Sequence, residues 1–197
     1  MTWLDSITLS GDHCTLVPLS HDHHDDLVEA VKDGELWKLW YTLIPAPDEM
    51  AEEIERRLRM QAQGSMIPFT VIDNNTAKVI GMTTFLNVEP ANRRLEIGAT
   101  WLSQSVQRSL VNTEAKSLLL TYAFETLHCN VVEFRTHRLN VSSRRSIERL
   151  GAKLDGILRH HMIMPDKTVR DTCVYSIIDC EWLTIKKHLH WLITKPR

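Results

Sequence analysis

The chain has 197 residues, of which 43% are hydrophobic and 24% are charged, and its formal net charge is −2. This length and composition suit one globular domain over residues 1–197 and exclude a disordered chain. A net charge near zero argues against nucleic acid or an anionic membrane as a partner, because such binders carry excess Lys and Arg. The arginine pairs at 56/57, 93/94 and 144/145 are interpreted as solvated faces.

Four cysteines stand singly, without the CxxC spacing of metal or redox sites. This usage is typical of reduced thiols in a cytosolic protein rather than of a disulfide framework. The N-terminal segment has no basic start followed by an apolar block, and no apolar run approaches membrane-spanning length. The sequence therefore predicts a cytoplasmic protein with no membrane partner.

The first third of the chain predicts a hairpin followed by two helices. Residues 7–9 and 14–18 are short strand-like runs, and Ser20 is placed to cap a helix over 20–32. After a proline-stiffened connection, a second helix is expected over 48–63, just before a glycine.

The run HDHHDD at 21–26 resembles a metal cluster at first sight. Ligands on a helix need spacings of three or four residues on one inward face, and a polar first helical turn explains the same residues. We therefore expect no bound metal, and a metal-binding module remains a third hypothesis that rests on this run alone.

The middle of the chain predicts three antiparallel strands, at 68–72, 78–86 and 94–102, with a turn signal at 73–75 between the first two. Residues alternate between the two faces of a strand, so the third strand should place Glu96 opposite an apolar stripe. That stripe is expected to consist of Leu95, Ile97, Ala99 and Trp101.

The second half of the chain alternates between helical and strand-like periods. The expected elements are a helix from 112 to about 127, a strand at 131–137, a helix from Ser142 or Ser143 to Leu150, a hairpin of 156–164 and 169–178, and a helix over 180–192. A strand, loop, helix and strand in this order form a βαβ arrangement, which needs a parallel strand pair. The fold class is therefore α+β with an α/β-type mixed sheet.

Three segments in this order resemble the GNAT N-acetyltransferases, and within them the ribosomal-protein N-terminal (Rim-type) subgroup. They are LEIGATWL at 95–102, QRSLVNTEA at 107–115 and NVSSRRSIERLGA at 140–152. The resemblance spans roughly residues 7–178. It implies a GNAT-like acyl-CoA N-acyltransferase fold, in which a central, mostly antiparallel sheet is splayed at two parallel strands and carries helices on both faces.

The resemblance further implies that acetyl-CoA lies in the splay between the strands that end near Trp101 and His137, with its pyrophosphate on backbone N–H groups of 107–112. Leu110 stands where the family usually has glycine, so a family-like loop would force it into a costly positive φ. Asn112 is expected to cap the following helix. The implied cofactor-binding residues are Thr100, Trp101, Leu102, Gln107, Arg108, Ser109, Leu110, Val111, Asn112, Thr113, Asn140 and Ser143.

Acyl transfer to an amine needs a base, an oxyanion donor and a proton for the departing thiolate. We expect Glu96 to be the base; the alternative is a solvent-facing carboxylate paired with Arg94 or another cation. Glu133 is a rival base on the next strand, and backbone N–H groups of 100–102 are the expected oxyanion donors. Ser143 is the expected acid, with a helix N-cap as its alternative. Tyr175 is a second expected acid, with a packed aromatic as its alternative.

Aromatic residues between the first two helices are expected to wall the acceptor site together with Glu133, as the resemblance implies. Trp40 and Tyr41 are the candidates for acceptor contact, whereas Trp37 is expected to lie in the core.

The overall prediction is an acetyl-CoA-dependent N-acetyltransferase in which a primary amine attacks directly in a ternary complex. The amine belongs to a protein or peptide N-terminus or to a small amino compound, and the resemblance makes a homodimer the expected assembly. The alternative is a non-catalytic acyl-CoA-binding or regulatory protein with the same fold.

Overall fold

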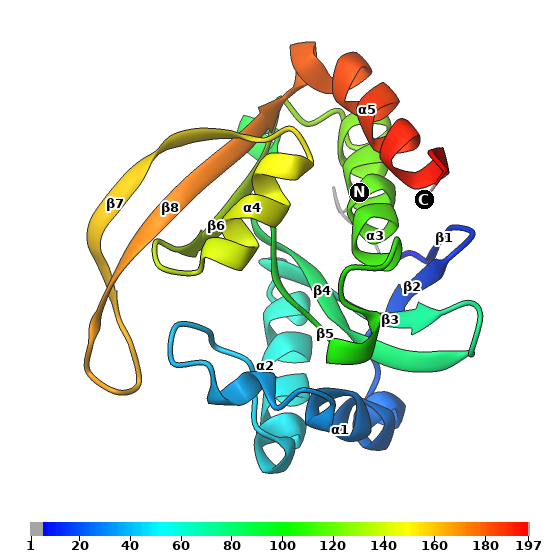
Figure 1. Ribbon diagram of the computed structural model, residues 1–197. Helices are drawn as coiled ribbons and strands as arrows, with labels where there is room; N and C mark the ends of the chain where they lie inside the picture. Colours follow the sequence, from blue (N-terminus) through cyan, green and yellow to red (C-terminus); the bar gives the residue numbers. More distant parts are fainter. Residues whose placement is uncertain (1–5, 197) are drawn as a thin grey trace.

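The structure, a computed structural model, describes residues 6–196 and is built on one mixed sheet (Figure 1). The strands lie in the order β1-β2-β3-β4-β5-β6-β8-β7. Their bounds are β1 Leu9–Ser10, β2 Cys14–Pro18, β3 Met66–Asp73, β4 Lys78–Glu89, β5 Arg94–Leu102, β6 Val131–His137, β7 Lys153–Ile163 and β8 Val169–Ile178. Among the strands of residues 6–196, only β5 and β6 run parallel, and all other neighbouring pairs are antiparallel. The predicted fold class is confirmed.

Helices cover both faces of the sheet (Figure 1). Their bounds are α1 His24–Lys32, α2 Met50–Ala62, α3 Val111–Thr121, α4 Val141–Arg149 and α5 Trp182–Thr194. The larger buried core gathers apolar side chains of α3, α4 and α5 against one face, and a smaller core gathers those of α1 and α2 against the other. No helix of residues 6–196 is long and apolar enough to cross a bilayer.

The polar run before α1 is used for helix capping. The Ser20 hydroxyl accepts a hydrogen bond from the Asp22 backbone N–H, and His23 Nδ1 accepts one from the Ser20 N–H. A short turn, His21–His23, then leads into α1. Within residues 6–196, no three His, Cys, Asp or Glu side chains come together as a metal site. The polar first turn therefore accounts for the histidine run.

A β-bulge in β5 is the local feature that positions the site. The parallel pairing of β5 with β6 runs only from Arg94 to Glu96, although both strands continue further. Between Met82 and Thr84 the register of β4 against β5 shifts, and Ala99 adopts a left-handed φ of 46°. An extra residue in one strand bends it and increases its twist. After Glu96, β5 therefore diverges from β6.

The bulge also corrects the predicted apolar stripe of β5. Leu95 and Ile97 lie in the core under α3 and α5, as expected, whereas Trp101 packs with Met82 in the core under α1 and α2. A one-residue offset moves every following side chain to the other face of a strand. The prediction that Trp101 shares a face with Leu95 was therefore wrong.

Gly81 lies opposite this part of β5 and has no room for a side chain. Its φ is +147°, and a Cβ there would lie 2.1 Å from the Trp101 carbonyl oxygen. We expect Gly81→Ala to lower the free energy of unfolding by more than about 2 kcal/mol, because backbone must move. Gly156→Ala is the control, since nothing lies within 4 Å of its added Cβ, and it should change stability by less than about 1 kcal/mol. Urea denaturation of both variants measures this, and equal effects would contradict the close approach.

Candidate active site

The loop between β5 and α3 is held by its own polar side chains. Gln107 Nε2 donates to the Leu102 carbonyl at 3.1 Å. The Ser109 hydroxyl donates to the Val106 carbonyl at 2.6 Å and accepts from the Val111 N–H at 3.2 Å. The loop therefore feeds directly into the first turn of α3 without a glycine.

The backbone of this loop corrects two predictions. Leu110 has a φ of −77°, in the right-handed region, and the left-handed residue is Arg108, with a φ of 64°. The expected strain at Leu110 is therefore absent. Because α3 already begins at Val111, Asn112 lies inside the helix, and the predicted N-cap at Asn112 was wrong.

The N-terminus of α4 is capped by Asn140. Its Oδ1 accepts a hydrogen bond from the Ser143 backbone N–H at 3.0 Å, and the helix begins at Val141. The alternative in which Ser143 is the N-cap was therefore wrong. Within the described residues, the half-buried Ser143 hydroxyl makes no hydrogen bond.

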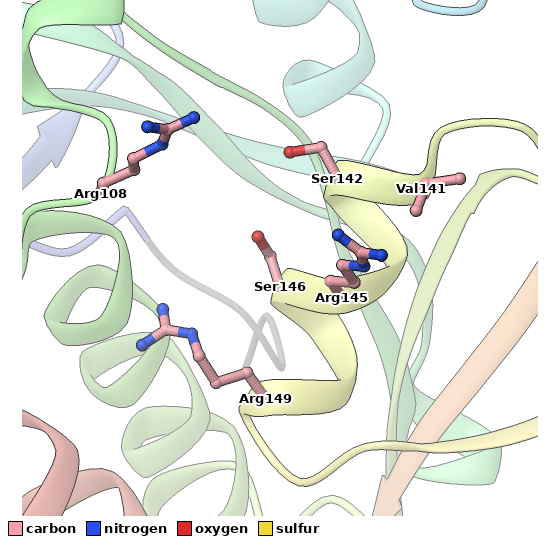
Figure 2. A pocket seen from close by; sticks show the side chains of 6 residues that line it. All are labelled: Arg108, Val141, Ser142, Arg145, Ser146 and Arg149. Carbon is pink, nitrogen blue, oxygen red and sulfur yellow. The ribbon is translucent and has the colours of Figure 1, made fainter.

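A cleft of about 460 Å³ lies between this loop and α4 (Figure 2). Figure 2 shows Arg108 on the loop side facing Ser142, Ser146 and Arg149 of α4 across the opening. The full lining is Arg108, Val141, Ser142, Arg145, Ser146 and Arg149. Guanidinium and hydroxyl groups without any carboxylate suit a phosphate-bearing ligand. The donor set therefore fits the phosphates of a CoA.

Arg149 also ties the two sides of the cleft together. Its Nη2 donates to the Thr113 hydroxyl at 2.9 Å, which joins α4 to the first turn of α3. Sequence reasoning missed the α4 residues of this cleft and treated the 144/145 pair as a solvated face. The available signal was helical spacing, since Ser142, Arg145, Ser146 and Arg149 recur every three or four residues on one helix face.

Glu96 is buried on the face of the sheet that α1 and α2 cover. Only 5% of the residue is exposed, and its Oε2 accepts a hydrogen bond from Asn87 Nδ2 at 2.7 Å. Arg135 Nε lies 3.5 Å from the same oxygen. Burial raises the pKa of Glu96 above its ordinary value, although Asn87 and Arg135 oppose the rise. The alternative of a solvent-facing carboxylate paired with Arg94 or another cation was therefore wrong about solvent exposure and about Arg94, although another cation, Arg135, does lie beside Glu96.

Glu133 lies beside Glu96 in the parallel register, but its charge is already matched. One carboxylate oxygen pairs with Arg94 and the other accepts from Arg135 Nη2 at 2.8 Å. Both carboxylate oxygens of Glu133 are therefore engaged by arginine side chains.

Two buried ring nitrogens without hydrogen-bond partners lie near the carboxyl ends of the diverging strands. They are Trp101 Nε1 on β5 and His137 Nε2 on β6, and no other buried side-chain nitrogen or oxygen among residues 6–196 lacks a partner. His137 Nδ1 accepts from the Leu139 N–H at 3.0 Å, and burial lowers the pKa of His137. Buried polar groups are normally paired. The Trp101 and His137 side chains therefore each offer an unused polar atom near the ends of β5 and β6.

Trp40 and Tyr41 lie against the same strand end. The Trp40 ring is 5.3 Å from that of His137 and 5.6 Å from that of Tyr41, both edge-on, and the Tyr41 ring is 6.5 Å from His137. Trp37 packs against the core under α1 and α2, as expected. The structure thus brings Trp40 and Tyr41 to the end of β6.

Tyr175 is fully buried on the face that α4 covers. Its hydroxyl donates to Glu148 Oε1 at 2.7 Å and accepts from Arg144 Nε at 2.9 Å. Burial raises the pKa of Tyr175 above its ordinary value. A hydroxyl engaged on both sides by α4 favours the packed-aromatic alternative.

Within residues 6–196, the mixed sheet thus opens at its one parallel pair, with the arginine-lined cleft on one face and the buried Glu96 carboxylate on the other. The sequence model of the acetyltransferase (GNAT) domain family matches residues 13–153. The chain therefore belongs to this family and is an N-acetyltransferase.

Similar proteins carry related descriptions. The chain is 32% identical over 102 residues to the "Putative ribosomal N-acetyltransferase YdaF" of Bacillus subtilis (strain 168), a match that covers 52% of this chain and 55% of that protein. The chain thus spans about half of that relative. It is 24% identical to the "Uncharacterized N-acetyltransferase p20" of Bacillus licheniformis over 89% of this chain and 98% of that one. The solved structure of a GCN5-related N-acetyltransferase from Brucella melitensis is 28% identical with a TM-score of 0.86, over 98% of this chain and 88% of that one.

The raised pKa of Glu96 predicts how stability depends on pH. The folded protein holds this proton to a higher pH than the unfolded chain, where Glu ionises near about 4.3. The free energy of unfolding therefore falls as pH rises from that value to the folded pKa, by up to about 1.4 kcal/mol per pH unit.

Glu96→Gln removes the ionisable group. As pH rises through that window, the free energy of unfolding of this variant should therefore increase relative to that of the wild type. Urea denaturation between about pH 4 and pH 8 measures the difference. Glu52→Gln, at an exposed position of α2, is the control and should follow the wild type. A constant difference between Glu96→Gln and the wild type would contradict the raised pKa.

Proposed function

We propose that this N-acetyltransferase moves an acetyl group from acetyl-CoA to a primary amine that attacks directly in a ternary complex. The observation that carries the proposal is the opening of β5 from β6 after Glu96, which lies between the arginine-lined cleft and the face of Glu96. We also propose that the protein is cytoplasmic, acts as one domain over residues 1–197 and assembles as a homodimer. These parts of the proposal rest on the family likeness.

The cofactor's phosphates would lie in the cleft, close to Arg108 and the arginines of α4. Backbone N–H groups of 107–112 and the first turn of α3, including Thr113, would add donors at the positive end of the helix dipole. Asn140 and Ser143, at the start of α4, border the same side. When bound, acetyl-CoA supplies a thioester carbonyl as the electrophile.

Residues of this chain would then manage protons and charge. Glu96 would accept the proton of the incoming amine, directly or through water, because its burial makes the carboxylate more basic. Backbone N–H groups of 100–102 would stabilise the negative charge that develops on the carbonyl oxygen. Ser143, whose hydroxyl has no partner among the described residues, would supply a proton to the departing thiolate.

The amine would approach from the face that carries Trp40, Tyr41 and His137. An α-amino group with a pKa near about 8 is about a tenth neutral at pH 7, whereas a lysine amine is roughly a thousandth neutral. A single buried carboxylate therefore suits an α-amine better. The description of the B. subtilis relative as a ribosomal N-acetyltransferase supports a protein N-terminus as one acceptor, beside small amino compounds.

Amine-dependent release of free thiol from acetyl-CoA tests the reaction. Peptides with free N-termini and small primary amines should both be assayed, and one of them should raise the rate above the amine-free background. Glu96→Gln should lower kcat/KM by about 100-fold, the usual size of a general-base contribution. Glu52→Gln should leave kcat/KM unchanged, since its side chain is exposed on α2. Full activity in Glu96→Gln would contradict the assignment of the base.

CoA affinity tests the cleft. Arg145→Ala and Arg149→Ala should each raise the Kd for CoA by about tenfold or more, because a charged hydrogen bond to phosphate is worth about 1.5–3 kcal/mol. Arg159→Ala is the matched control, since Arg159 pairs with Asp171 on the β7–β8 hairpin and lines no part of the cleft. Calorimetry measures all three values. A change below about twofold in both cleft variants would place the phosphates elsewhere.

A further inference from the structure

Two buried cations from opposite faces of the sheet reach the bulge of β5. Arg57 of α2 is 1% exposed and Lys116 of α3 is 6% exposed. Charged residues are rarely buried so completely unless they hold a specific partner. The interpretation of the 56/57 arginine pair as a solvated face was therefore wrong for Arg57.

Arg57 reaches the bulge from the side of α1 and α2. Its Nη2 donates to the Ala99 carbonyl at 3.2 Å and its Nη1 donates to the Thr84 hydroxyl at 2.6 Å. Its Nε donates to Glu53 Oε1 at 2.6 Å, one helical turn earlier in α2. One guanidinium thus joins α2, β4 and the bulged residue of β5.

Lys116 reaches the bulge from the side of α3. Its Nζ donates to the Thr100 hydroxyl at 2.6 Å and to the Thr83 hydroxyl at 3.0 Å. The Thr100 hydroxyl in turn donates to the Gly98 carbonyl at 3.3 Å. No carboxylate of residues 6–196 forms an ion pair with Lys116, and burial lowers its pKa from 10.5 to about 7. The Lys116 amine therefore donates to two hydroxyls, one on β4 and one on β5, and within these residues it forms no salt bridge.

These contacts fix two successive peptide groups. Arg57 holds the carbonyl of Ala99, and Lys116 holds the carbonyl of Gly98 through Thr100. A peptide group is planar, so holding a carbonyl also sets the direction of the N–H in the same group. The N–H groups thereby set are those of Ala99 and Thr100. Ala99 is also in a left-handed conformation that costs a non-glycine residue about 1–2 kcal/mol, so the bulge needs such support.

We propose that Arg57 and Lys116 are positioning residues that clamp the bulge of β5 and so aim the Thr100 N–H, the first of the proposed oxyanion donors at 100–102, at the thioester carbonyl. This inference rests on the proposed function. Neither side chain touches the reacting atoms in this role. They act by restricting the backbone conformation of a strand segment whose N–H donors must be oriented before the reaction begins. A preorganised donor needs no rearrangement in the transition state.

The clamp is tested with two variants that keep side-chain length. Arg57→Lys keeps the charge but cannot reach Glu53, Thr84 and Ala99 at once. Lys116→Met removes the ammonium and leaves the two threonine hydroxyls to pair with each other at 2.8 Å. Each variant should lower kcat about tenfold or more, whereas the Kd for CoA should change less than about threefold, because the phosphates lie on other residues.

The matched control is Leu189→Ala, which removes a fully buried side chain of α5 and so costs stability without removing a hydrogen bond to the bulge. Its kcat should stay within about twofold of the wild type. Thr100→Val and Thr83→Val each remove a hydroxyl that accepts from Lys116, with little change of side-chain volume. They replace Lys116→Met in the test if that variant does not fold. Clamp variants whose kcat matches that of Leu189→Ala would overturn the proposal.

Hydrogen exchange separates this inference from the proposed function. The amides of 98–102 should exchange about tenfold or more faster in Arg57→Lys and Lys116→Met, whereas in Leu189→Ala they should change only as much as the other strands do. Unchanged exchange of these amides in both clamp variants would overturn the clamp even in an active enzyme. A wild type that releases no thiol with any amine would overturn the proposed function while this measurement still decides whether the clamp exists.

The double variant tests whether the two cations act on one element. Because Arg57 and Lys116 hold neighbouring peptide groups, the effects of their substitution on kcat should overlap. The double variant, Arg57→Lys with Lys116→Met, should therefore lower kcat by less than the product of the two single fold-reductions. If the fold-reduction in kcat of the double variant equals the product of the single fold-reductions, the two residues act independently and the joint clamp is overturned.

Discussion

The bulge at Ala99 is the constraint on which the rest of the structure depends. It ends the parallel pairing of β5 and β6 after Glu96 and turns Trp101 to the face that α1 and α2 cover. A regular β5 would pair with β6 along its full length, because both strands continue well past the last pair. The sheet would then separate its two faces completely. The opening exists because one residue adopts a conformation that β-strands avoid.

The two faces of the sheet carry different chemistry. The face under α3 and α4 presents the arginine-lined cleft, whose positive charge suits phosphate groups. The opposite face presents Glu96 and Glu133 with their paired cations, and Trp40 and Tyr41 contact His137 at the end of β6. In the proposed function, the sheet therefore separates the side that would bind the phosphates from the side that carries the proposed base. The opening after Glu96 is where the two sides meet.

Local signals in the sequence were enough for the elements and for part of the site. The face of Glu96 followed from period-two alternation, and α1 followed from Ser20 as its cap. The bulge could not be predicted, because Ala99 carries no turn signal and its conformation depends on contacts with distant residues. For the same reason the left-handed residue of the loop was expected at Leu110 and lies at Arg108.

The buried charged residues of the helices could not be identified from sequence patterns either. On a helix, Arg57, Lys116 and Arg149 look like ordinary solvent-facing positions, since each is charged and has one polar or charged residue next to it in the sequence. Their partners, Ala99, Thr100 and Thr113, lie 42, 16 and 36 residues away. Only the packed fold brings a cation on one element to a carbonyl or hydroxyl on another. What decides the site here is therefore long-range pairing of polar groups, which periodicity does not record.

A crystal structure of the protein with bound CoA is the most direct test of this account. The account predicts that the pantetheine arm passes between β5 and β6 beyond Glu96 and Glu133, with the phosphates beside Arg108, Arg145 and Arg149. A complex in which CoA lies elsewhere, and in which no ligand atom enters the space between the ends of β5 and β6, would contradict it.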